Sequence, residues 1–174
     1  MSDVADPEGA TEPDPEPEQL HGVPVSWSRD QRVLHPSRSQ LLDVVTALRE
    51  DGYLSCLDVT GVDYLTHPGR PLPEGIAPER FEVVVTLISH RERQRIRLRV
   101  QVPGDDPTCP SLFAVHPGTE AMEREVYDMF GVVFEGHPDL TRILMPEDWL
   151  GHPLRKDYES GRIPVQFKGA PTVR

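Results

Sequence analysis

The strongest constraint on the fold is a pair of apolar stretches joined by a short polar turn in the middle of the chain. Residues 81–88 and 95–102 are rich in the β-branched and aliphatic residues that strands favour, and the intervening residues 89–94 are few enough for a hairpin. A Pro- and Gly-containing turn at residues 103–107 ends the second stretch abruptly. We expect a further strand at residues 53–60. The sequence therefore predicts a sheet built around a hairpin.

The second stretch alternates between apolar and polar side chains with the period of a strand. Its apolar face carries Ile96, Leu98, Val100 and Val102, and its polar face carries Arg95, Arg97, Arg99 and Gln101. Together with Arg91 and Arg93, these residues make a ribbon of five arginines in nine positions. The ribbon is interpreted as a solvated outer face, a surface for a protein partner or a nucleic-acid site. The absence of interleaved aromatic residues disfavours the nucleic-acid site.

Helical periodicity flanks the predicted sheet on both sides. Apolar residues recur at helical spacing through residues 41–48, and Asp51-Gly52 supplies a stop. A second amphipathic helix is expected from Thr119 to Phe130, where Gly131 follows in the position that favours a left-handed residue. Helices mixed with strands in this order predict an α+β domain.

The two ends of the chain differ from this central part. Residues 1–20 contain seven of the acids that give the net charge of −11, together with four prolines and no Lys or Arg. Such a composition cannot bury enough apolar surface to offset its ordering entropy. We therefore expect a disordered acidic arm at residues 1–22, an α+β domain at 23–134 and an extended, partner-docking segment at 135–174.

Several classes of protein are disfavoured by composition. The N-terminus lacks the basic start and apolar stretch of a signal peptide, and no apolar run approaches a membrane span. Cys56 and Cys109 lack the spacing of a disulfide scaffold or an iron–sulfur site and are expected to be structural thiols. The chain is expected to be soluble and cytoplasmic, or held at a membrane only through partners.

Three carboxylates on the second predicted helix are candidates for a functional role. Glu123, Glu125 and Asp128 could serve general acid–base chemistry, face solvent, or form salt bridges to a neighbouring domain or subunit. Their spacing does not converge on one substrate atom, which favours the salt bridges. Arg124 and Asp128 lie four residues apart and could also pair along the helix.

Two corners of the sequence Gly-His-Pro follow this helix. Proline biases the histidine before it toward extended conformations, so His137 and His152 are interpreted as turn residues. A zinc site built from these histidines and a nearby acid is the alternative, although their spacing matches no common ligand motif. From Arg142 onward the chain is polar and rich in turn formers, but it contains apolar and aromatic anchors that favour a partner: Trp149, Leu154, Tyr158, Ile163, Val165 and Phe167. Trp and Tyr are among the residues that most often dominate interface energy.

The region around this helix contains a dense motif made of Glu123-Arg124-Glu125, 127–131, Phe134, 136–140, 142–144 and 153–158. This motif resembles the signature of a known family, the C subunit of the bacterial proton-translocating NADH:quinone oxidoreductase, respiratory complex I or NDH-1. Weaker similarity extends back to residue 37 and includes residues 62–64, 80–84 and 110–111. Ala121 departs from the family, which often has tryptophan there.

The resemblance implies a two-layer α+β domain with a mixed β-sheet and packed helices, followed by an extended C-terminal segment. It also implies a peripheral-arm protein without catalytic residues, at the cytoplasmic side of the cell membrane. NADH, FMN, the iron–sulfur clusters and quinone would be bound by other subunits. The expected partners are the subunits that form the quinone site and carry the terminal cluster.

The hypothesis for this chain is architectural: its charged helix and C-terminal corners would dock on those subunits and support electron transfer to quinone coupled to proton translocation. The expected interface residues are Glu123, Arg124, Glu125, Asp128, His137, Arg142, Trp149, Arg155, Lys156, Asp157 and Tyr158. Two alternatives stay open. One is the equivalent subunit of a membrane-bound hydrogenase or other-donor complex, and the other is a nucleic-acid-binding adaptor that uses the Arg91–Arg99 ribbon.

Overall fold

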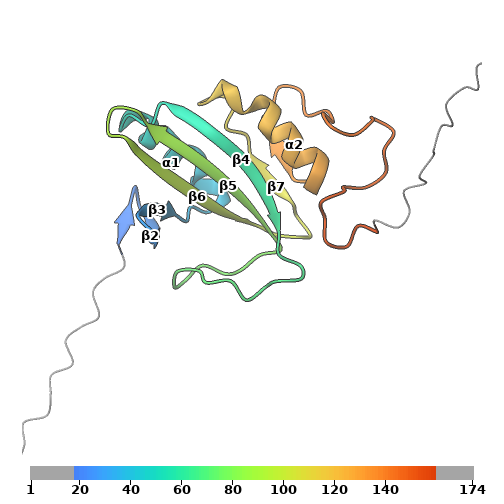
Figure 1. The fold of residues 1–174 in the computed structure, drawn as a ribbon, viewed down its shortest axis with the longest axis horizontal. Coiled ribbons are helices and arrows are strands. Elements are labelled where there is room, and N and C mark those ends of the chain that lie inside the picture. Colours follow the sequence, from blue (N-terminus) through green and yellow to red (C-terminus); the bar gives the residue numbers. More distant parts are fainter. Residues whose placement is uncertain (1–17, 160–174) are drawn as a thin grey trace, which may run out of the picture.

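A computed structural model describes residues 18–159, which form a six-stranded sheet with helices on one face (Figure 1). The strand order is β1-β2-β3-β6-β5-β4, and all neighbours are antiparallel except β3 and β6, so the sheet is mixed. The strands are β1 Gln19–Leu20, β2 Val23–Ser28, β3 Gln31–Leu34, β4 Ser55–Asp63, β5 Phe81–Ser89 and β6 Gln94–Val102. The predicted α+β fold with a mixed sheet is confirmed.

The hairpin of β5 and β6 forms the centre of the sheet, as predicted. The two strands pair without interruption from Phe81↔Val102 to Ser89↔Gln94. The apolar side chains of β6 are at most 1% exposed, which confirms their predicted place in the core. The expected strand at 53–60 is also present, although β4 begins and ends slightly later.

The N-terminal strands were not predicted from the sequence. β1 pairs with β2 at residues 19–20, inside the range assigned to the acidic arm, and β3 pairs in parallel with β6. The remainder of that arm, residues 1–17, lies outside the described residues. These strands have two to six residues each, too few to show a clear period, and β3 is placed by a partner far along the chain.

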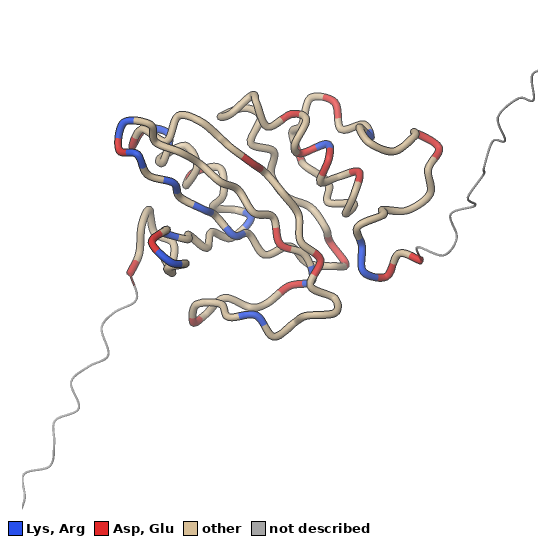
Figure 2. The backbone as a smooth tube through the Cα atoms, in the orientation of Figure 1, with Lys and Arg blue, Asp and Glu red and all other residues tan. Residues whose placement is uncertain are grey.

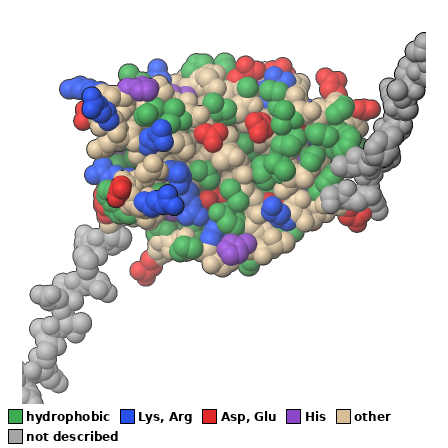
Figure 3. All heavy atoms as spheres, viewed as in Figure 1, with side chains coloured by type: hydrophobic (Ala, Val, Ile, Leu, Met, Phe, Trp, Pro, Cys, Tyr) green, Lys and Arg blue, Asp and Glu red, His purple; other side chains and the backbone are tan. Residues whose placement is uncertain are grey.

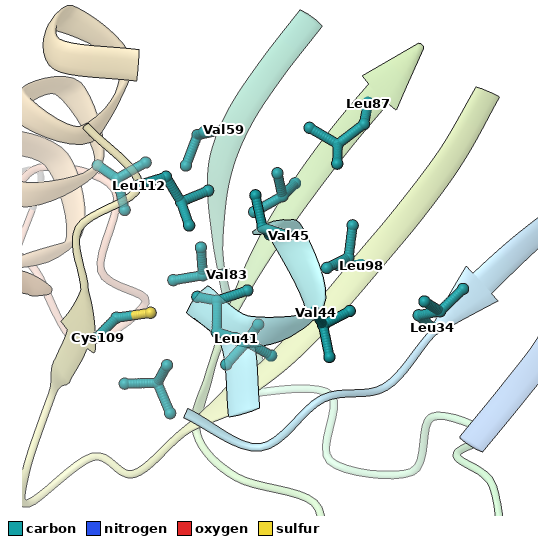
Figure 4. Packing of buried hydrophobic residues seen from close by; sticks show 14 of the residues in the cluster. Leu34, Leu41, Val44, Val45, Val59, Val83, Leu87, Leu98, Cys109 and Leu112 are labelled. Atoms are coloured by element: carbon teal, nitrogen blue, oxygen red, sulfur yellow. The ribbon is translucent and has the colours of Figure 1, made fainter. Parts of the chain in front are cut away.

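Helices α1 Leu41–Glu50 and α2 Glu120–Phe130 both pack on one face of the sheet, and each follows a short 3₁₀ turn, Arg38–Gln40 and Pro117–Thr119. Side chains of α1 lie over β5 and β6 (Figure 4). α2 lies on β4 at Gly61, where an added methyl carbon would be 2.7 Å from a ring carbon of Phe130. The absence of a side chain at Gly61 is what allows this approach.

Two short strands, one before α2 and one after it in the sequence, pair with each other in parallel. β7 Thr108–Pro110 precedes the helix and β8 Val133–Glu135 follows it. Gly131 ends α2 with a φ of +73°, as the sequence predicted. Cys109 of β7 is buried in the core and Cys56 is half-buried, and both are free thiols. Burial raises the pKa of Cys109 to about 12 and that of Cys56 to about 11.

The described part of the C-terminal segment, residues 136–159, is built from turns and bends, without helix or strand. It returns toward the sheet, since the Leu154 amide donates to the carbonyl of Met129 at 3.0 Å. Figure 1 shows this segment in orange and red beside α2. Residues 160–174 of the predicted docking segment lie outside the described residues.

Candidate partner-docking surface

Glu123 lies on α2 and is fully buried, although it was expected at an interface with another protein. Its carboxylate accepts hydrogen bonds from Ser111 Oγ at 2.6 Å, Thr119 Oγ1 at 2.8 Å and the Leu112 amide at 2.8 Å. These three donors satisfy the carboxylate within the chain. Glu123 therefore fixes the loop after β7 to the helix within the chain, and its place across or beneath an interface with another subunit stays a prediction.

Asp128 is also fully buried and forms the centre of a second internal site. Its Oδ1 pairs with Arg142 at 2.6 Å, and its Oδ2 accepts the consecutive amides of Ile143, Leu144 and Met145 at 3.1, 2.8 and 2.8 Å. Burial alone would raise the pKa of Asp128, but these four donors hold the pKa below its usual range. Asp128 thus fixes the course of residues 142–145.

Arg124 does not pair with Asp128 as the four-residue spacing suggested. Its guanidinium instead donates to the backbone carbonyls of Thr141 at 3.1 Å and Arg142 at 3.0 Å, with Glu120 at 3.5 Å as its ion pair. Asp128 is not free to pair with it, because Arg142 and three backbone amides already bind the Asp128 carboxylate. Arg124 and Asp128 therefore both fix the backbone of residues 141–145.

Asp63, at the end of β4, anchors the far end of the segment and was not predicted as a site residue. Its buried carboxylate binds Arg80 at 3.0 Å and accepts the Lys156 amide at 2.9 Å, while Arg80 also pairs with Asp157 at 2.8 Å. Burial favours a higher pKa for Asp63, but the hydrogen bonds from Arg80, Lys156 and Leu65 lower it. The only sequence signal for this role was the weak similarity at residues 62–64.

The two predicted turn histidines bind backbone carbonyls. His137 Nε2 lies 3.0 Å from the Glu120 carbonyl, and its Nδ1 accepts the Asp139 amide at 3.1 Å. His152 Nδ1 lies 3.0 Å from the Asp128 carbonyl, and burial lowers its pKa. Within residues 18–159, no group of three His, Cys, Asp or Glu is placed to hold a metal ion.

Arg155 closes the contact between the segment and α2. Its Nε donates to the Phe130 carbonyl at 2.5 Å, and its guanidinium lies 5.1 Å from the centre of the Phe81 ring. Burial lowers the pKa of Arg155. A cation bound to the last carbonyl of a helix also complements the helix dipole. Arg155 therefore acts within the chain.

The other expected interface residues are more accessible. Glu125 and Lys156 are exposed and Asp157 is half-exposed, whereas Trp149 and Tyr158 are partly buried. The Trp149 amide donates to the Pro146 carbonyl, while its buried Nε1 has no hydrogen-bond partner in the described part of the chain. Glu125 and Lys156 are thus the predicted residues whose charges face outward.

Sequence reasoning named Leu154 as an anchor but missed the other apolar side chains that this segment exposes. Leu150 is 87% exposed, Leu144 is 61% exposed, and Ile143 and Leu154 are also exposed. We call these four residues the apolar ledge. Figure 3 shows hydrophobic side chains gathered on the part of the surface formed by α2 and the segment after it. Apolar side chains that are exposed together on a surface are typical of a protein interaction site.

None of the helices in the described region, 18–159, is long and apolar enough to cross a membrane.

Comparison with solved structures supports the fold and the family. Nqo5, in a trypsin-resistant fragment, matches 68% of this chain and 90% of its own length with 35% identity and a TM-score of 0.60. A chain of the membrane-bound sulfane sulfur reductase, an archaeal respiratory membrane complex, has a TM-score of 0.62 over 87% of this chain and 90% of its own length. Its identity of 20% shows a shared fold alone.

Sequence comparison gives the same relationship. The C subunit of NADH-quinone oxidoreductase from Mycolicibacterium gilvum is 48% identical over 145 residues, which are 82% of this chain and 60% of the relative. Its counterpart from Saccharopolyspora erythraea is 47% identical over 84% of this chain and 56% of its own length. The chain therefore spans about 60% of the length of such relatives. The family model described as "Respiratory-chain NADH dehydrogenase, 30 Kd subunit" matches residues 34–163, and the chain belongs to this family of complex I subunits.

Proposed function

We propose that this chain is the C subunit of a proton-translocating NADH:quinone oxidoreductase and that its role is architectural. The names of its relatives support the assignment to this complex. The observation that supports the architectural role is that the buried carboxylates of the charged motif point into the chain. Glu123 and Asp128 face into the chain, where they hold the loop before α2 and the segment after it. That segment presents the apolar ledge outward, together with exposed charged side chains.

In this proposal the chain binds no cofactor and contributes no catalytic residue. NADH, FMN, iron–sulfur clusters and quinone are bound by other peripheral-arm subunits, at the cytoplasmic side of the cell membrane. The chain reaches the membrane only through those partners. Electron transfer to quinone and the coupled proton translocation then depend on this chain through the placement of its neighbours.

The apolar ledge is the proposed contact with the subunits that form the quinone site and carry the terminal cluster. Removing apolar surface from water contributes roughly 25 cal/mol per Å², from which the entropy and desolvation costs of association are subtracted. The backbone amide of Leu144 already donates a hydrogen bond to the Asp128 carboxylate. Because this bond fixes the backbone at Leu144, docking loses little conformational entropy there. Lys156 and Glu125 are exposed as well and add charges to the surface of this part of the chain.

The test is recovery of the assembly through an affinity tag on this chain from mildly solubilised membranes. The expected result is a large complex with NADH:quinone reductase activity that contains this chain in stoichiometric amount. A large complex that is inactive with NADH but active with hydrogen would assign the chain to a related complex. Recovery of the chain alone would contradict membership of any such assembly.

A further inference from the structure

Arginines gather at the end of the sheet that lies opposite the apolar ledge. Figure 2 shows the blue positions around the β5–β6 turn, along β6 and at the β2–β3 turn. We call this group the basic end. It consists of Arg29, Arg32, Arg91, Arg93, Arg95 and Arg97.

Most of these arginines form no ion pair with a carboxylate in the described region, and the two that do form long ones. Arg91 pairs with Glu92 at 3.5 Å, and Arg32 lies 3.7 Å from Glu18. Within residues 18–159, no ion pair involves Arg29, Arg93, Arg95 or Arg97, and the guanidinium of Arg97 donates a hydrogen bond to the side-chain carbonyl of Gln31.

Arg99, the last arginine of the predicted ribbon, is different and marks the limit of the basic end. It is partly buried and binds the buried carboxylate of Glu82 through two bonds of 2.7 and 3.0 Å. Arg70 and Gln101 bind the same carboxylate. The ribbon is therefore not a uniform solvated face, because its inner end is neutralised within the chain and its outer end is not.

Two adjoining hollows lie between these arginines. One has a volume of about 520 Å³ and is lined by residues that include Trp27, Arg32, Arg93 and Arg95. The other, of about 480 Å³, is lined by Ser28, Arg29, Asp30, Gln31 and Arg97, and the two share Asp30 and Gln31. The hollows give an extended acidic peptide a place where its carboxylates meet several guanidinium groups.

The chain itself contains an acidic segment that directly precedes Glu18 in the sequence. Residues 1–17 contain Asp3, Asp6, Glu8, Glu12, Asp14 and Glu16 and no Lys or Arg. Glu18, which follows directly, already contacts the basic end. Its carboxylate accepts a hydrogen bond from Trp27 Nε1 at 2.8 Å and lies beside Arg32, whose guanidinium is 5.5 Å from the Trp27 ring centre.

We propose that the acidic N-terminal segment, residues 1–17, binds intramolecularly to the basic end and covers its arginines. Seventeen residues reach about 60 Å at full extension, so length does not limit the contact. A short tether gives the segment an effective concentration on the order of millimolar, which allows weak individual ion pairs to act together. The segment thereby keeps other polyanions, nucleic acid included, away from the arginine ribbon.

The test is paramagnetic relaxation in the full-length ¹⁵N-labelled chain with a nitroxide at Ala10→Cys. Cys56 is replaced by serine, and the fully buried Cys109 is kept. At about 0.01 M salt, where the screening length is roughly 30 Å, we expect loss of amide signals at Gln31, Gln94 and Arg95. At about 1 M salt, where it is roughly 3 Å, these signals return.

Charge-reversal variants separate a specific contact from general attraction. Arg93→Glu with Arg95→Glu should abolish the signal loss, whereas Lys156→Glu, an exposed cation at the other end of the molecule, should leave it unchanged. Signal loss that is absent, or that survives the double reversal, would overturn the proposal. A mixture of ¹⁵N-labelled protein without nitroxide and nitroxide-carrying protein without ¹⁵N tests for contact between separate chains. Signal loss in this mixture would overturn the proposal in favour of binding to a second copy.

A second measurement tests the covering of the arginines. The affinity of the full chain for heparin should rise when all six acids of residues 1–17 are converted to amides. Equal affinity of the two proteins would contradict the proposed contact.

Discussion

At the scale of single residues, the charges of the motif on α2 serve the chain's own fold. The Asp128 carboxylate alone receives one guanidinium and three consecutive amides, and Glu123 receives two hydroxyls and one amide. A sequence gives the types of these residues but not their direction. The four-residue spacing of Arg124 and Asp128 was compatible with a helix-surface pair, and only the returning segment revealed a better partner in Arg142.

The importance of the Asp128 site can be tested with Asp128→Asn. The amide cannot satisfy all four donors and leaves Arg142 without its ion pair, so the free energy of unfolding should fall by roughly 3–5 kcal/mol. Urea denaturation measures this change. Glu125→Gln, on the exposed side of the same helix, is the matched control and should change stability very little. Equal stability of the two variants would contradict the internal role of Asp128.

His35 makes stability depend on pH. Burial, with a smaller effect of Arg99, lowers its pKa from 6.5 to about 4. Between these values the unfolded chain binds more protons than the folded chain, so the contribution of His35 is complete above pH 6.5 and is lost as the pH falls toward 4. Its full size is about 3 kcal/mol. Denaturation at several pH values measures how the free energy of unfolding changes with pH. This dependence should be weaker in His35→Gln than in the unchanged protein, and it should be the same as in the unchanged protein in the exposed control His90→Gln.

At the scale of elements, the packing of α2 on β4 determines where the motif lies. The approach depends on Gly61, which stands between Phe130 and Val126. Helix and strand periods predicted α1, α2, β5 and β6 because each buries one regular face. They did not predict β1 to β3 or β7 and β8, because strands of two to six residues show little period and depend on distant partners.

The close approach at Gly61 can be tested with Gly61→Ala. The added carbon would lie 2.7 Å from Phe130, so either α2 moves or β4 bends, and stability should fall by roughly 1–3 kcal/mol. Thermal unfolding measures the loss. Gly69→Ala is the control, because a methyl group there meets no heavy atom within 4 Å. Unchanged stability of Gly61→Ala would show that the helix does not depend on this contact.

At the scale of the whole molecule, two surfaces of different character lie at opposite ends. The apolar ledge is carried by a segment that Asp128, Arg155 and Asp63 bind to the domain. The sequence predicted a docking role for this segment from its aromatic anchors and its length. It could not predict that Leu144 and Leu150 would be exposed while Glu123 and Asp128 are buried, because that depends on which side chains the returning turns bury.

Docking of the C-terminal segment on neighbouring subunits is best tested by a double variant of the apolar ledge in assembled membranes. Leu144→Ser with Leu150→Ser changes only exposed side chains, and Leu54→Ser, at a leucine 62% exposed elsewhere on the domain, is the control. The measurement compares the yield of tag-purified complex with NADH:quinone turnover per complex. We predict a lower yield with unchanged turnover in the double variant, and neither change in the control. Normal yield with reduced turnover would contradict the architectural role and indicate a direct part in the reaction.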